Sequence, residues 1–402
     1  MLYHPFSEAL FDDPWPVYGR LRDEAPAYYL EEFDCWFLSR FEDVWNAAGD
    51  RRFLAGGGVT TLELLLGQRF PTPGTPFASL DPPRHTELRR LLAPAFLPAA
   101  ARALEGPTRE LARRFLDEEL PKGELDLVGD LAMRVSVRVA CLILGIPQED
   151  ADLLCGAVNQ SFQREPGQRG QTEAGQAAGE RMRDYLAKTV HERRQGRQRG
   201  EGLIDRMLDF EVASGWSDAD IVSNLSLLVV GGTETLPKVF AGAAWQLARH
   251  PEQRARVAAD PALAADAFWE GLRLEMPTTM LGRTLGEDVE LHGERLRAGQ
   301  KAMFLWAAAN RDEREFPDAE RFDALRRAPR LLSFGQGTHR CLGHNVARME
   351  GRILLEELLA RVPEYEVVEE RAVRLRSEFF RGFASLPIRF PSQRGRSQRG
   401  RS

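Results

Sequence analysis

Apolar residues recur every three or four positions through most of residues 98–210. This spacing is typical of amphipathic helices, each of which turns an apolar stripe towards a core. Leu104, Leu111 and Phe115 form one such stripe, and a similar spacing returns after Ser217. The pattern therefore predicts helix after helix through the middle of the chain.

Short segments rich in aromatic and branched residues lie outside this helical region. Residues 28–30 and 35–38 predict two strands of a small sheet, and residues 289–293 and 301–305 predict further short strands. Residues 366–390 predict a hairpin that follows a final helix. We therefore expect a mostly α fold with small β regions, built around a long central helix.

That long helical pattern runs over residues 217–249 and would span about 50 Å at the rise of an α-helix. Its middle breaks the rules of helix formation, because it holds Gly231, Gly232 and Pro237. Each glycine costs about 1 kcal/mol and a proline about 3 kcal/mol in a helix interior. The proline also leaves a carbonyl near Thr233 without its N–H partner. Either the surrounding protein tolerates these residues, or they form a kink that has a function.

The composition, 43% hydrophobic and 28% charged over 402 residues, is that of an ordinary globular protein. No linker rich in Pro, Gly or Ser divides the chain, so we expect one domain over residues 1–391. Residues 392–402 repeat Ser-Gln-Arg-Gly-Arg, which predicts a disordered basic tail. The formal net charge of −6 argues against a general nucleic-acid binder, and we expect no nucleic-acid partner.

No apolar run approaches the about 20 residues that a membrane-spanning helix needs, and the N-terminus lacks the pattern of a secretory signal. The four cysteines form no CxxC pair and no zinc spacing, which fits a reduced compartment. We therefore expect a cytoplasmic monomer without a membrane anchor.

The candidate chemistry lies in the glycine-punctuated loop of residues 334–343, where Cys341 precedes a predicted helix over residues 344–359. A thiol at a helix N-terminus faces unpaired N–H groups and the positive end of the helix dipole. Together with Arg340, these favour a thiolate, which is a soft metal ligand or a nucleophile. Three possibilities stay open: a buried structural cysteine, a nucleophile with His339 as its base, or a ligand to haem iron.

This loop resembles the ligand loop of the cytochrome P450 family, Phe-Gly-x-Gly-x-His-x-Cys-x-Gly, at every defining position. The matching residues are Phe334, Gly335, Gly337, His339, Cys341 and Gly343. The resemblance implies that the loop binds heme b, with Phe334 and Gly335 among the cofactor-binding residues. It implies that the Cys341 thiolate is the axial ligand and favours O–O cleavage. It further implies that His339 anchors a haem propionate and is not a base.

A second element of the resemblance lies near residue 85. Asp81 and the two prolines after it predict a helix start, with Asp81 as N-cap. His85 and Arg89 then share one helical face, which is usually a solvated surface and is alternatively a clamp for an anion. The segment resembles the family's Asp-Pro-Pro-x-His-x-x-x-Arg element. The resemblance implies that His85 and Arg89 bind haem propionates.

The interrupted centre of the long helix resembles the family's Ala/Gly-Gly-x-Asp/Glu-Thr motif, over Gly231, Gly232, Glu234 and Thr235. The resemblance implies a kinked groove that holds dioxygen above the iron. It also implies catalytic roles for Glu234, which feeds protons inward, and for Thr235, whose hydroxyl hydrogen-bonds to the oxygen. An acid is needed because cleaving O2 to release water consumes two protons in an otherwise dry pocket.

Glu270 and Arg273 lie three residues apart on a predicted helix, where their side chains can pair. This spacing alone is a weak signal, because many helical surfaces offer it. Followed by Pro277 and Arg283, it resembles the family's pattern. The resemblance implies a structural ion pair that is shared with Arg321, and it implies that Arg283 is a third propionate-binding position.

The resemblance also implies which segments line the substrate pocket. One is the loop of residues 53–80, which on its own reads as an ordinary surface excursion. The others are the start of the kink, the strand edge after Met276 and the turn of the C-terminal hairpin. The candidate lining residues are Leu65, Phe70, Phe77, Val230, Gly231, Thr278, Thr279, Leu281, Phe379 and Phe380.

The resemblance covers essentially the whole chain and implies a haem-thiolate monooxygenase. Such an enzyme inserts one oxygen atom of O2 into an apolar small molecule, here a terpenoid, steroid, fatty acid or aromatic compound. Electrons would come from an external ferredoxin and an NAD(P)H-dependent ferredoxin reductase, with docking near basic residues such as Arg89, Arg90, Arg340 and Arg348. One alternative is a peroxygenase driven by hydrogen peroxide, against which Glu234 and Thr235 speak. Another is a non-catalytic haem-binding sensor.

Overall fold

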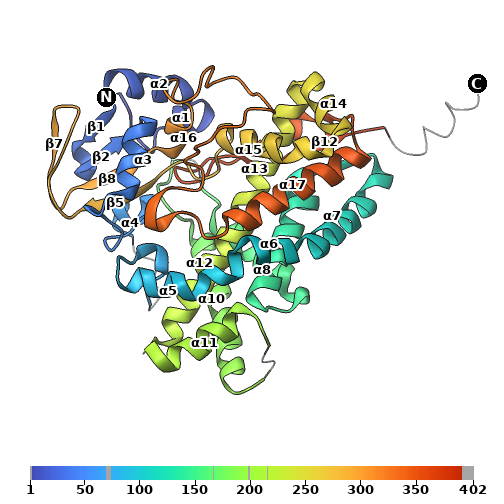
Figure 1. The fold of residues 1–402 in the computed structure, drawn as a ribbon, viewed down its shortest axis with the longest axis horizontal. Coiled ribbons are helices and arrows are strands. Elements are labelled where there is room, and N and C mark those ends of the chain that lie inside the picture. The colour runs from blue at the N-terminus through green and yellow to red at the C-terminus, as the bar shows by residue number, and fades with distance from the viewer. Residues whose placement is uncertain (1, 69–73, 166, 198–199, 215, 392–402) are drawn as a thin grey trace, which may run out of the picture.

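Helices form most of the fold, and this computed structural model describes residues 2–68, 74–165, 167–197, 200–214 and 216–391. The longer helices are α7 (Glu105–Glu119), α8 (Met133–Leu144), α9 (Ala151–Ser161), α10 (Glu173–Arg194), α11 (Leu203–Ser214), α12 (Asp218–Thr233), α13 (Thr235–Arg249), α15 (Ala264–Leu274) and α17 (His344–Arg361). The shorter ones are α1 (Glu8–Asp12), α2 (Trp15–Glu24), α3 (Phe41–Gly49), α4 (Thr61–Leu66), α5 (Arg84–Leu92), α6 (Pro98–Ala103), α14 (Pro251–Ala259) and α16 (Trp306–Ala309). Figure 1 shows α12 and α13 running through the middle of the molecule. Among the described helices, none is long and apolar enough to cross a membrane.

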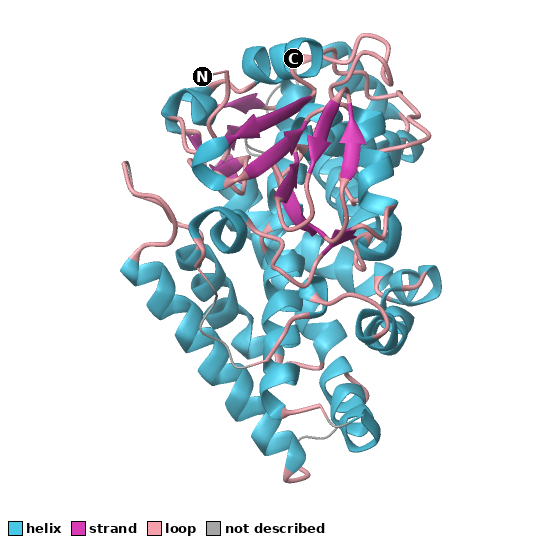
Figure 2. Cartoon of the chain, turned by 90° about the vertical axis from the view of Figure 1, so that its left-hand side faces the viewer, coloured by secondary structure: helices cyan, strands magenta, loops and turns pink. Residues whose placement is uncertain are grey.

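The strands form four small sheets, most of them gathered at one end of the molecule (Figure 2). The largest sheet has the order β1-β2-β8-β5-β3, in which only the β2–β8 pair is parallel. Its strands are β1 (Ala27–Leu30), β2 (Cys35–Leu38), β3 (Phe53–Leu54), β5 (Leu281–Leu285) and β8 (Lys301–Phe304). The smaller sheets join β4 (Glu124–Asp126), β12 (Pro387–Arg389) and β9 (Glu366–Val367), then β6 (Val289–Leu291) and β7 (Glu294–Leu296), and finally β10 (Val373–Arg374) and β11 (Phe383–Ser385). The expected mostly α fold with small β regions is confirmed.

The long helical pattern forms two consecutive helices. α12 begins behind a capping box, in which the Ser217 hydroxyl and the Asp220 carboxylate each accept from the other's backbone N–H. α12 ends at Thr233 and α13 begins at Thr235, so Glu234 alone separates them. Pro237 accounts for the break, because its ring nitrogen cannot donate to the Thr233 carbonyl. The break lies at Glu234, within the segment from Gly231 to Pro237 where the sequence predicts an interruption.

Close helix packing holds the core around α13, α15 and α17, and two glycines on different helices make it possible. A Cβ at Gly271 of α15 would lie 2.4 Å from the Cβ of Ala243 in α13. A Cβ at Gly351 of α17 would lie 2.1 Å from a ring carbon of Phe268 in α15. Any larger side chain at either position would collide with the neighbouring helix, so these three helices form one interlocked unit.

A buried carboxyl group lies between α17 and α8 in this core. Glu350 is 4% exposed, and its Oε2 accepts from the Ser136 hydroxyl at 3.0 Å. Burial raises the pKa of Glu350 to about 8, and the hydrogen bond from Ser136 opposes this rise only in part. The folded protein therefore holds a proton here that the unfolded chain releases near the ordinary glutamate pKa of 4.5.

Glu350→Gln is expected to flatten the pH dependence of stability. The contribution of a protonated Glu350 is complete below about pH 4.5 and is lost as pH rises towards about 8. Glutamine keeps the shape and undergoes no such loss. The free energy of unfolding of the variant, relative to wild type, should therefore rise by about 4 kcal/mol between about pH 5 and about pH 8. Urea unfolding at both pH values measures this change. Glu364→Gln, at an exposed position, is the control, and an equal change there would contradict the assignment.

Candidate active site

The loop before α17 presents Cys341 through a tightly folded backbone. The Cys341 N–H donates to the Phe334 carbonyl at 2.7 Å, which closes the loop on itself. Gly337 has a φ of 73° and lies against α3, where a Cβ would come within 2.6 Å of the Ala48 carbonyl. Only glycine combines that left-handed conformation with so close an approach. The glycines of this loop thus fix the position of the thiol.

Cys341 is exposed as a residue, but protein atoms crowd its thiol and desolvate it. Desolvation by these atoms raises the pKa of Cys341, while the Gly343 N–H and the guanidinium groups of Arg89 and Arg340 lower it. The expected thiolate-favouring groups are therefore present, but desolvation outweighs them in the protein alone. A metal cation bound at the sulfur would supply the missing stabilisation, because a coordinating thiol loses its proton outright.

Two histidines and two arginines converge beside this loop. His85 of α5 and His339 of the loop have ring centroids 4.1 Å apart. Arg89, one turn further along α5, donates from Nη2 to the Arg340 carbonyl at 2.7 Å. Arg283 of β5 is 6% exposed and donates to the carbonyl of its neighbour Gly282. We call His85, Arg89, Arg283 and His339 the basic cluster.

The Asp81 carboxylate compensates the charge of the basic cluster only in part, by raising the pKa values of His85 and Arg283 against the effect of burial. Burial, together with Arg283, His85 and Arg89, lowers the pKa of His339 to about 3. Burial also lowers the pKa of His85 and lowers that of Arg283 to about 10. Both ring nitrogens of His85 and Nη1 of Arg89 are buried without a hydrogen-bond partner among the described residues. Buried donors normally have partners, so the cluster fits an anionic group such as a haem propionate.

Asp81 does not cap α5 as expected. Its two carboxylate oxygens accept from the N–H groups of Ala55 and Gly56, each at 2.9 Å. α5 begins at Arg84, with Pro83 at the N-cap position. Asp81 thus ties the start of α5 to the segment after β3, a long-range contact that competes with local capping.

The break between α12 and α13 contains a buried ion pair. Glu234 and Lys238 are both 2% exposed, and Lys238 Nζ contacts Glu234 Oε1 and donates to the Glu234 carbonyl at 3.0 Å. Oε2 of Glu234 is buried and has no partner among the described residues. Burial raises the pKa of Glu234, and Lys238 opposes that rise. The carboxyl group therefore has one anchored oxygen and one oxygen free to accept a proton.

Thr235 begins α13, and its hydroxyl donates to the Gly231 carbonyl at 2.9 Å. No atom lies within 4 Å of a Cβ built on Gly231, so the helix surface beside the hydroxyl is open. Val230, the residue before Gly231, is half-buried. The break therefore combines a hydroxyl, a buried acid and open space on adjacent residues.

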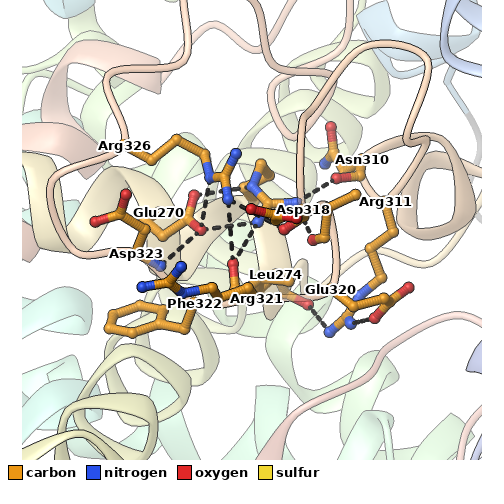
Figure 3. A network of polar contacts seen from close by, with 12 residues as sticks. Glu270, Leu274, Asn310, Arg311, Asp318, Glu320, Arg321, Phe322, Asp323 and Arg326 are labelled. Atoms are coloured by element: carbon orange, nitrogen blue, oxygen red, sulfur yellow. Dashed lines mark hydrogen bonds and ion pairs between the residues drawn. The ribbon is translucent and has the colours of Figure 1, made fainter.

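A fully buried ion pair joins Glu270 and Arg273 of α15. Figure 3 shows the network of polar contacts around Glu270. Arg273 donates to both carboxylate oxygens of Glu270 at 2.7–2.8 Å, and Nη1 donates to the carbonyls of Asn310 and Ala319. The second guanidinium on Glu270 belongs to Arg326, whose Nε donates at 3.1 Å. The expectation that Arg321 shares the pair by its side chain was wrong. Arg321 contributes its backbone carbonyl, which accepts from Arg273 Nη2 at 3.3 Å.

The structure brings some of the pocket candidates together. Thr278 forms a β-bridge with Phe380, and the Thr279 N–H donates to the Phe379 carbonyl at 2.9 Å. The rings of Phe379 and Phe380 are 4.5 Å apart. The strand edge and the turn of the C-terminal hairpin are therefore one wall.

The remaining candidates are dispersed. Phe77 is buried, with its ring stacked 6.1 Å from His85. Leu65 of α4 is buried in a core cluster that includes Leu64, and Leu281 of β5 packs against another cluster of the core. Phe70 lies outside the described residues.

Sequence reasoning missed three charged residues near these positions. Lys238 could have been found, because it lies four residues after Glu234 on one helical face. Arg326 could not, because no periodic element links it to Glu270. A third is Arg164, which forms a buried ion pair with Glu378 beside the hairpin turn at 3.2 Å.

Comparisons with known proteins agree on one family. The family model described as Cytochrome P450 matches residues 169–389. The chain is 33% identical to a putative cytochrome P450 123 of Mycobacterium tuberculosis over 96% of both chains. It is 31% identical to a vitamin D(3) 25-hydroxylase of Pseudonocardia autotrophica over 95% of both. The crystal structure of CalO2 is similar with a TM-score of 0.86 and 30% identity, and covers 97% of this chain and 99% of that one.

Proposed function

We propose the substrate class, the electron donors and the residue roles of this chain. The premise is that the chain belongs to the cytochrome P450 family and is a cytochrome P450 monooxygenase. It inserts one oxygen atom of O2 into an apolar small molecule. An external ferredoxin and an NAD(P)H-dependent ferredoxin reductase supply the electrons. The observation that carries this proposal is the buried Glu234 beside Thr235 at the helix break, since a reaction that cleaves O2 needs a proton source there.

The cofactor is heme b, which, when bound, supplies the redox-active iron that activates dioxygen. Cys341 would ligate the iron through its thiolate, and Phe334 and Gly335 would lie against the cofactor. The basic cluster would bind the propionates, because its buried nitrogens without partners and its excess of positive charge over the single Asp81 carboxylate match two carboxylates.

Glu234 and Thr235 deliver the protons that the cleavage of O2 requires. The free Oε2 of Glu234 can take up a proton, because burial favours the neutral carboxyl group. Lys238 holds the other oxygen and keeps the carboxyl group from turning away. The Thr235 hydroxyl donates to Gly231 and can turn that donor towards the open space beside it. Lys238 is thus a positioning residue for the acid.

Glu234→Gln is expected to slow product formation driven by ferredoxin, reductase and NAD(P)H by about a hundredfold, the range of a lost general acid. It should leave product formation driven by hydrogen peroxide within about twofold, because peroxide brings its own protons. Both rates are measured on one substrate, chosen by the shift that it induces in the Soret band. Glu110→Gln, at an exposed position on α7, is the control.

Two outcomes would contradict this proposal in different ways. If wild type turns over only with peroxide, the chain is a peroxygenase. If it binds haem but forms no product with either oxidant on any substrate that shifts the Soret band, it is a haem-binding sensor.

The substrate is an apolar small molecule of the size of a terpenoid or steroid. Aromatic side chains at Phe77, Phe379 and Phe380 support this class, because they offer flat apolar surface. The vitamin D(3) 25-hydroxylase relative, by its name, acts on a molecule of that kind.

The electron donor would dock at the exposed arginines beside the cysteine loop, Arg90, Arg340 and Arg348. A positive surface there would attract an acidic ferredoxin. We assign the enzyme to the cytoplasm, because all four of its cysteines are free thiols and that compartment keeps thiols reduced.

A further inference from the structure

A cavity of about 310 Å³ lies where α2, the C-terminal ends of α13 and α15, and β10 meet. Its volume is at the lower end of the about 300–1,000 Å³ of small-molecule sites. Neither Cys341 nor any residue of the basic cluster lines it. Five arginines do: Arg249, Arg311, Arg321, Arg374 and Arg381.

The cavity carries an excess of positive charge. Its two glutamates are already engaged: Glu320 pairs with Arg311, and Glu275 accepts from Gln246 at 2.7 Å. Figure 3 shows Arg311 and Glu320 together on one side of the Glu270 network. The other four arginines have no carboxylate partner among the residues that the structure describes. Gln246 is neutral, so Glu275 keeps its charge, which acts on Arg311 and Arg381. Five guanidinium groups thus face two carboxylates, which leaves an excess of three positive charges.

Three of these arginines also hold nitrogens that are buried and unpartnered within the described chain: Nε of Arg311, Nη1 of Arg374 and Nε of Arg381. Arg311 is only 5% exposed. A buried donor without a partner is costly, and a charged one more so. These three nitrogens have almost no accessible surface, so they add positive charge behind the cavity wall and do not line the cavity themselves.

Two tryptophans keep the guanidinium groups in place. The guanidinium carbon of Arg311 lies 3.5 Å from the ring centroid of Trp15, and that of Arg381 lies 4.9 Å from the same centroid. The guanidinium carbons of Arg374 and Arg249 lie 4.8 Å and 4.6 Å from the ring centroid of Trp245. Stacked guanidinium groups lose little freedom when they bind a planar or tetrahedral anion. The donors are therefore preorganised.

We propose that this cavity binds a small organic polyanion, with two or more negative charges carried by phosphate or carboxylate groups. The ligand would neutralise the excess charge and accept hydrogen bonds from the guanidinium groups that line the cavity.

The site also adjoins the substrate wall. The Arg381 N–H donates to the Pro277 carbonyl at 2.8 Å, and the preceding Phe380 bridges Thr278. A bound polyanion would therefore stiffen the turn that carries Phe379 and Phe380.

Calorimetric titration of the haem-loaded enzyme with pyrophosphate and, separately, with citrate tests the proposal. The titrations are done without divalent metal and at one ionic strength. At least one anion should bind saturably at one site, and the tighter of the two identifies phosphate or carboxylate as the preferred group. Arg374→Gln and Arg249→Gln should each weaken that binding by about tenfold or more.

Arg371→Gln is the matched control, because Arg371 is exposed, pairs with Glu124 and lies outside the cavity three residues from Arg374. It should change the affinity by less than about twofold. Arg249 is exposed at the end of α13, so its variant is expected to fold even if that of Arg374 does not. The proposal fails if neither anion binds saturably, or if Arg249→Gln binds as tightly as wild type and as Arg371→Gln. Since the readout is heat of binding, this failure is independent of whether the monooxygenase proposal holds.

Discussion

Cys341→Ala is expected to remove the thiolate-type Soret band from the spectrum of the reduced, carbon monoxide-treated protein and to bring oxygen-dependent turnover below detection. The reason is that the loop presents a single sulfur, fixed by the Cys341–Phe334 hydrogen bond and by Gly337 against α3. Thiolate ligation is what pushes electron density towards O–O cleavage in this family. Haem can still be held by the basic cluster, so the variant should retain part of its haem.

The control for this experiment is Cys155→Ala. Cys155 is half-buried on α9, and burial raises the pKa of its thiol to about 11. Its removal should leave both the band and the turnover as in wild type. A thiolate-type band that persists in Cys341→Ala would refute Cys341 as the ligand.

Arg273→Lys is expected to destabilise the protein by about 3–5 kcal/mol and to lower its haem content. Arg273 is fully buried and donates to both oxygens of Glu270 and to three backbone carbonyls. Lysine keeps the charge but has no planar fork, so several of these acceptors lose their donor inside the core. Breaking one side of a buried pair has costs of this size. Urea unfolding and haem absorbance per protein measure the two effects.

Arg327→Lys is the matched control, because the Arg327 side chain is 76% exposed and pairs with Asp266 on the surface. Its expected cost is below about 1 kcal/mol. A companion pair separates the two arginines near Glu270. Arg326→Ala should destabilise the protein clearly more than Arg321→Ala, because only the Arg326 side chain reaches Glu270. Equal losses of stability in the two variants would support the original expectation that Arg321 shares the Glu270–Arg273 pair.

Local patterns predicted the elements well. The strands near Tyr28 and Trp36, the capping box at Ser217 and the helix that follows Cys341 depend on residues close together in the chain, and all are present. Hydrophobic period and capping chemistry act over a few residues, so a single sequence contains their signal. Pro237 also marked the break between α12 and α13 to within three residues.

The failures involve partners that are distant in sequence or a choice between competing hydrogen-bond donors. Asp81 has a local capping role available, but the backbone near Ala55 competes for its carboxylate. Arg326 replaces Arg321 on Glu270 because the backbone between them turns in a way that no period encodes. The cationic cavity likewise draws arginines from segments more than a hundred residues apart, which only the folded chain brings together.

The interlocked glycines of α15 and α17 have a consequence for building hybrid enzymes. Gly351 leaves room for the ring of Phe268, and Gly271 leaves room for Ala243. A crossover point between residues 271 and 351 would join one parent's α13 and α15 to another parent's α17. Any mismatch in side-chain volume at this seam would separate the ion-pair scaffold from the cysteine loop. Recombination blocks for this enzyme should therefore inherit residues 243–351 from one parent.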